Sequence, residues 1–102
     1  MTALRRAAEE YVALRRRLGF HNDTQARILR RFTTFAAEER APAVTTALVL
    51  RWANQMTDVL PATAARSVSV VRLFAVWWRQ RDPRTEVPPA RLTRVSPFRQ
   101  RI

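Results

Sequence analysis

Apolar residues recur at three- and four-residue spacing along most of the chain, which is the pattern of amphipathic helices and not of strands. The first such stripe begins at Leu4 and stops beside Gly19, the only glycine in the sequence. Glycine is common just after the last residue of a helix, because it adopts a left-handed conformation without steric cost. We therefore predict a first helix that ends at Gly19, followed by a polar turn at residues 21–24 that can cap a second helix.

Three further helices are predicted after this turn. The second helix carries its own apolar stripe of Ile28, Leu29, Phe32, Phe35 and Ala36. It ends before Pro42, and a third helix follows from Thr45 or Thr46, either of which can serve as the N-cap, to about Met56. A fourth helix starts at about Ala62, and a proline-rich segment ends it. No strand pattern occurs, so the expected fold class is all-α, a bundle of four helices.

A cationic face lies opposite the apolar stripe of the second helix. Its members fall within an arc of about 100° when the helix is projected at about 100° per residue: Arg27, Arg30, Arg31 and Thr34. Arginines opposite a core stripe usually form only a solvated surface. Here no acidic residue lies between Asp23 and Glu38, so this helix is expected to have one apolar face and one cationic face.

The fourth helix has two apolar lines. The first is the expected core stripe of Ala64, Ser67, Val68, Val71, Phe74, Ala75 and Trp78. The second, beside Arg66, consists of Val70, Leu73 and Trp77. A helix that is apolar over most of its circumference is either central in its bundle or has a second partner, such as another domain or protomer. The sequence leaves both alternatives open, and for the two tryptophans it favours core packing over stacking on bases.

The charge of the chain indicates a polyanionic partner. Nineteen basic residues, all of them arginine, stand against 8 acidic ones and give a formal net charge of +11 over 102 residues. Codon usage in a GC-rich genome also produces an arginine bias. The chemical consequence is independent of that origin, because a guanidinium group makes bidentate contacts with phosphates and guanine edges that an ammonium group cannot make.

Several classes of chemistry are excluded by residue types that are absent or rare. The chain contains no cysteine, one glycine and one histidine, His21, which lies in a polar turn. We therefore expect no metal site, no cofactor, no glycine-rich phosphate cradle and no catalytic residues. The length suits one domain, and no apolar run approaches the ~20 residues of a membrane span. The expected location is cytoplasmic, associated with the nucleoid.

Five motifs of the chain follow one another in a specific order. They are Tyr11-x-x-x-Arg-Arg-x-Leu18-Gly19-Phe20, Phe32-x-x-Phe35, Trp52-Ala53, Arg66-x-x-x-x-Val71-Arg72-x-Phe74-Ala75 and Asp82-Pro83-x-Thr85-Glu86-Val87-Pro88-Pro89. Together they resemble the N-terminal core-binding domain of tyrosine recombinases, the phage-integrase family. The resemblance extends over nearly the whole chain, from about Tyr11 to Arg101.

The resemblance implies a SAM-like bundle of two helical hairpins, which forms half of a clamp on double-stranded DNA at a recombination half-site. Residues 1–82 would be this domain, and residues 83–102 a proline- and arginine-rich linker toward a catalytic domain. The residues implied to contact DNA lie on the second helix and at the start of the fourth: Thr24, Arg27, Arg30, Arg31, Thr63 and Arg66. The implied role is in DNA integration and site-specific recombination.

The chain departs from this family because it lacks the catalytic Arg, His-x-x-Arg and Tyr elements. Strand cleavage by this polypeptide alone is therefore predicted to be absent. The second apolar line of Val70, Leu73 and Trp77 could meet the first helix, a catalytic domain or another protomer, and Trp77→Ala is expected mainly to alter solubility or partner binding. Two alternatives remain, a small helical DNA-binding regulator of the helix-turn-helix type and a protein-interaction module.

Overall fold

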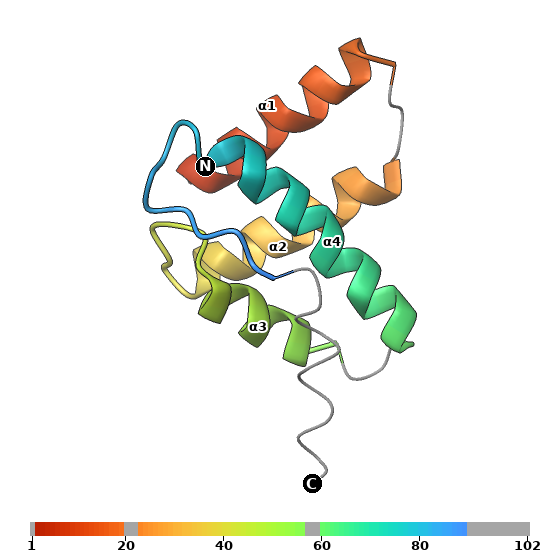
Figure 1. The fold of residues 1–102 in the computed structure, drawn as a ribbon, viewed down its shortest axis with the longest axis vertical. Helices are drawn as coiled ribbons and strands as arrows, with labels where there is room; N and C mark the ends of the chain where they lie inside the picture. The colour runs from red at the N-terminus through yellow and green to blue at the C-terminus, as the bar shows by residue number, and fades with distance from the viewer. Residues whose placement is uncertain (1, 20–22, 57–59, 90–102) are drawn as a thin grey trace, which may run out of the picture.

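The computed structural model describes residues 2–19, 23–56 and 60–89, and these contain four helices and no strand. The helices are α1 (Ala3–Arg17), α2 (Asp23–Glu38), α3 (Thr46–Asn54) and α4 (Pro61–Trp78). In Figure 1, α1 and α2 run in opposite directions, and α4 crosses in front of α2. The helix α4 contacts each of the other three, and α3 packs against α2 and α4. The predicted all-α fold of four helices is confirmed.

Local signals in the sequence set most of the helix ends. The Thr2 hydroxyl accepts a hydrogen bond from the Arg5 backbone N–H at 3.1 Å and caps α1. Gly19 follows that helix with a φ of 96°, as predicted. At α3, Thr45 is the N-cap, because its hydroxyl accepts from the Leu48 N–H at 3.1 Å. The helix α4 begins one residue earlier than predicted, since a proline at the first helical position loses no hydrogen bond.

The end of α2 carries a left-handed residue that is not glycine. Arg40 has a φ of 56°. The N–H of Ala41 donates to the Ala36 carbonyl at 2.9 Å, and the Arg40 N–H donates to the Ala37 carbonyl at 3.0 Å. These two bonds form a Schellman motif, which satisfies carbonyls that the helix end would otherwise leave unpaired.

The core lies where α4 meets the other helices. The fully buried side chains at its centre include Leu29, Phe32, Leu48, Val49, Val68, Val71 and Phe74. The ring of Phe32 lies 5.2 Å from that of Trp52, which ties α2 to α3. The predicted core stripe of α4 is buried from Ser67 to Ala75, whereas Ala64 and Trp78 are half-buried.

The second apolar line of α4 faces mostly inward. Val70 is buried, and Trp77 is half-buried with its ring 5.4 Å from that of Tyr11 on α1. Leu73 remains 48% exposed. Val70 belongs to the buried core of the chain, and a partner that meets α4 through this line stays a prediction. Of the alternatives left open by the sequence, the central position in the bundle accounts for Val70 and Trp77.

The segment after α4 packs back onto the domain. Thr85 and Pro88 are buried, and the N–H of Glu86 donates to the Val44 carbonyl at 2.8 Å. The Glu86 Oε1 accepts from the Thr46 N–H at 2.9 Å, at the start of α3. Figure 1 shows this segment in blue, returning from the end of α4 past α3. The first part of the predicted linker thus contacts the domain, and residues 90–102 lie outside the described residues.

Candidate nucleic-acid interface

The cationic face predicted for α2 lies on the surface. Its members Arg27, Arg30, Arg31 and Thr34 are all exposed. The opposite face of the same helix is buried at Leu29, Phe32 and Phe35. The amphipathic projection is therefore confirmed, because residues of one helix keep their angular relation whatever the helix packs against.

A depression of about 520 Å³ lies along this face, between α2 and α3. Its lining consists of Arg27, Arg30, Arg31, Thr34, Phe35, Glu38, Trp52 and Gln55. Phe35 and Trp52 are each 6% exposed, so apolar rings lie beneath the arginines. The site thus combines exposed cationic side chains with an apolar base, which suits a ligand that has both anionic and flat surfaces.

The three arginines of the depression differ in their electrostatic partners. Arg30 Nε lies 4.0 Å from Glu9 Oε2 on α1. Within the described residues, Arg27 and Arg31 form no hydrogen bond or ion pair. Their guanidinium groups therefore keep all of their donors available for a ligand.

The acidic side chains are mostly paired with arginines elsewhere. Glu10 contacts Arg81 at 2.8 Å, and Asp23 contacts Arg16 at 3.2 Å. Two further ion pairs join Arg51 to Glu39 at 3.4 Å and Arg84 to Asp82 at 3.0 Å. Because these acids are engaged away from the depression, the described acidic residues that offset its positive charge are Glu9, through Arg30, and Glu38 in its lining.

The remaining predicted residues do not line this depression. Thr24 is exposed in the first turn of α2, and Thr63 and Arg66 are exposed in the first two turns of α4. The structure brings Arg27, Arg30 and Arg31 together but leaves Thr24, Thr63 and Arg66 outside their depression. A contact between DNA and any of these six residues stays a prediction.

Gln55 and Glu38 belong to the depression, yet the sequence did not single them out. Gln55 is exposed just after α3, and Glu38 is the last residue of α2. An amide and a carboxylate can accept or donate at base edges that an arginine cannot read. The sequence carries no signal for these two residues, because the distance between Glu38 and Gln55 depends on how α3 packs against α2. Residue spacing along the chain does not reveal that packing.

Other kinds of site were sought in the same part of the chain. Among the described residues, no three side chains of the His, Cys, Asp or Glu type come together as a metal would require. No helix of the described part is long and apolar enough to span a membrane. In the segment after α4, the Arg84 guanidinium holds the pKa of Asp82 below its usual value through a direct hydrogen bond.

These features define a small all-α domain with a cationic helix face beside a shallow depression. The chain is 37% identical, over 101 residues and 99% of its length, to a Sinorhizobium fredii protein named "Putative integrase/recombinase y4rB". It spans 32% of that protein. No family model matches the chain, and no solved structure matches it. The similarity confirms the resemblance to recombinases that the motifs predicted.

Proposed function

We propose that this chain binds double-stranded DNA through the cationic face of α2 and serves DNA integration and site-specific recombination. The observation that carries the proposal is the pair of exposed guanidinium groups, Arg27 and Arg31, which have no partner within the described residues and lie beside one depression. The recombinase name of the relative supports it, since the similarity covers 99% of this chain.

The chemistry of the α2 face fits the backbone of a duplex. Guanidinium groups bind phosphate oxygens through short, charge-assisted and often bidentate hydrogen bonds. An α-helix also fits the major groove, so a helix with arginines along one face can reach phosphates and base edges together. Thr63 and Arg66, exposed at the start of α4, would add a second contact from another helix.

The proposal assigns DNA binding and not strand cleavage to this chain. It spans 32% of the recombinase relative, so the remaining two thirds of such a protein offer room for the catalytic residues. A protein-interaction surface on α4 has less support, because Val70 is buried and Trp77 is half-buried in the chain itself.

A mobility-shift titration of the whole chain tests the proposal, with a mixed-sequence duplex of about 30 base pairs. Arg27→Ala and Arg31→Ala should each weaken binding about tenfold at moderate salt, as expected for loss of a charge-assisted phosphate contact. Arg79→Ala is the matched control, since it removes the same charge from the exposed end of α4. Unchanged affinity of the α2 variants, or an equal loss with Arg79→Ala, would contradict the proposed site.

A further inference from the structure

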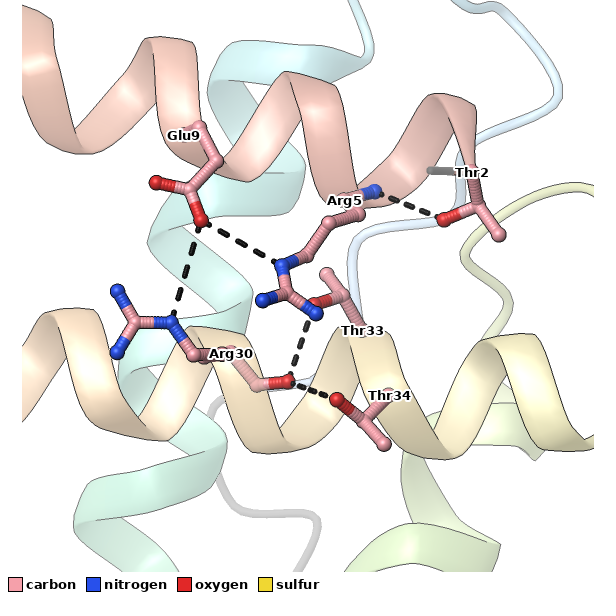
Figure 2. A network of polar contacts seen from close by, with 6 residues as sticks. All are labelled: Thr2, Arg5, Glu9, Arg30, Thr33 and Thr34. Carbon is pink, nitrogen blue, oxygen red and sulfur yellow. Dashed lines mark hydrogen bonds and ion pairs between the residues drawn. The ribbon is translucent and has the colours of Figure 1, made fainter.

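Glu9 on α1 reaches the cationic face of α2. Its Oε2 lies 3.4 Å from Arg5 Nε and 4.0 Å from Arg30 Nε. Figure 2 shows the Nε of Arg30 facing the Glu9 carboxylate across the gap between the two helices. Among the described acidic side chains, Glu9 is the one that pairs with an arginine of the α2 face.

The main chain of α2 at Arg30 is hydrogen-bonded within its own helix, so a change of partner involves only the Arg30 side chain. Thr33 and Thr34 both donate their hydroxyl hydrogens to the Arg30 carbonyl, at 3.1 and 2.8 Å. These contacts, drawn in Figure 2, involve the main-chain carbonyl of Arg30 and not its guanidinium. Arg30 is a lining residue of both the depression beside α3 and the narrower gap beside Glu9. Arg30 can therefore turn toward either helix.

The contact between Arg30 and Glu9 is weak enough to exchange. The two side chains are 55% and 47% exposed, and water screens a pair at the surface. A phosphate that approaches α2 offers Arg30 a closer and better-aligned anion than a carboxylate at 4.0 Å. The Glu9 carboxylate and a DNA phosphate therefore compete for the Arg30 guanidinium, and the contact with Glu9 has to break when the phosphate binds.

We infer that Glu9 is a positioning residue that holds Arg30 away from DNA and so lowers the affinity of the α2 face. This inference rests on the proposed DNA binding and adds a regulator to the same site. Arg27 and Arg31, which pair with no acidic side chain in the described part of the chain, would make the first phosphate contacts. Arg30 would join them only when its contact with Glu9 opens.

A double-mutant cycle in DNA binding tests this inference, measured by fluorescence anisotropy of a labelled mixed-sequence duplex with the whole chain. Glu9→Gln should tighten binding about threefold at low salt, within the range of an exposed ion pair. It should also steepen the dependence of log affinity on log salt by about 0.9, since one more phosphate is neutralised. In the Arg30→Ala background, the gain from Glu9→Gln should disappear.

Glu10→Gln is the matched control for net charge. Glu10 is the next residue of α1 and pairs with Arg81 in the segment after α4, so its loss removes the same charge without freeing Arg30. Equal gains from Glu9→Gln and Glu10→Gln would show general repulsion and overturn the inference. A gain from Glu9→Gln that persists without Arg30 would overturn it as well.

The two proposals fail in different ways. If the parent chain and Arg31→Ala bind the duplex equally poorly, the proposed function fails and the inference falls with it. If the parent binds and Arg31→Ala weakens it, but Glu9 and Arg30 show no coupling, only the inference fails. Thermal unfolding of each variant provides the structural control, because a change in fold would alter the melting temperature as well as the affinity.

Discussion

The ring of Tyr11 lies 5.4 Å from the ring of Trp77, tilted by 48°, and this contact joins α1 to the last turn of α4. Tyr11 also meets Phe74 edge-on at 5.7 Å. On the other side, the Arg81 guanidinium lies 4.9 Å from the centre of the Trp77 ring. Trp77 is thus a link between two helices and the segment that follows them.

Trp77→Ala should lower the free energy of unfolding by about 2 kcal/mol, below the range for a fully buried aromatic because Trp77 is half-buried. Urea denaturation followed by circular dichroism measures this change. Leu73→Ala is the control on the same helix and should cost less than about 0.5 kcal/mol, since Leu73 is 48% exposed. Equal effects of the two substitutions would contradict the packing role of Trp77.

Arg40→Gly should stabilise the protein by about 0.5 to 1 kcal/mol. Arg40 has a φ of 56°, and glycine adopts this left-handed conformation without the steric cost that a Cβ imposes. The Schellman bonds at the end of α2 would be retained, because they involve only the backbone. Ala37→Gly, inside the same helix, should instead destabilise by about 1 kcal/mol. A loss of stability with Arg40→Gly, measured by urea denaturation, would disprove the strain.

Glu86→Ala should cost about 1 kcal/mol, as expected when a helix loses a side chain that caps its first turn. The carboxylate accepts from the Thr46 N–H at 2.9 Å, and alanine leaves that donor to water. Glu38→Ala removes the same charge from the exposed end of α2 and should be nearly neutral. Melting temperatures that fall equally in both variants would show a charge effect and not a cap.

A chain shortened to Asp82 should melt at a lower temperature than one shortened to Pro89. The shorter form loses the buried Thr85 and Pro88, and it also leaves the Val44 carbonyl without its backbone partner. Differential scanning calorimetry of the two forms measures the difference. Identical melting temperatures would place the structural boundary at residue 82, where the sequence predicts it.

Asp82 should contribute stability that depends on pH. Its carboxylate accepts from Arg84 Nε and Nη2, at 3.1 and 3.0 Å, and this lowers its pKa below the ordinary 3.8. A carboxyl group with a lowered folded pKa stabilises the fold above its unfolded pKa, and this contribution is lost as pH falls through the folded pKa. The stability gap between the parent and Asp82→Asn should therefore shrink below about pH 4 in urea denaturation. A gap that is constant with pH would contradict this coupling.

The sequence predicted those features that depend on one helix at a time. The apolar spacing, Gly19 and Thr45 located the helices, because caps and periodicity act over a few residues. The exposed face of Arg27 and Arg31 followed from the same periodicity. The burial of Val70 did not, since two apolar lines on one helix do not reveal how many neighbours that helix has.

Contacts between residues far apart in the chain could not be predicted from the sequence. The depression beside α2 needs Trp52 from α3 and Gln55 just after it, and their position depends on how the two helices cross. The bond between Glu86 and Thr46 joins residues 40 positions apart, in a segment whose prolines indicated only an extended linker. Composition identifies such a segment as non-helical, but packing decides whether it is free or bound.

The Glu86–Thr46 bond closes a loop of 40 residues that contains all of α3 and α4. Closing a loop of this length costs entropy, so the bond forms only when both helices are already in place. When the segment after α4 detaches, the Thr46 N–H at the start of α3 loses its partner, so we expect the two openings to occur together. Hydrogen exchange at a single amide, that of Thr46, would report whether the segment after α4 is docked.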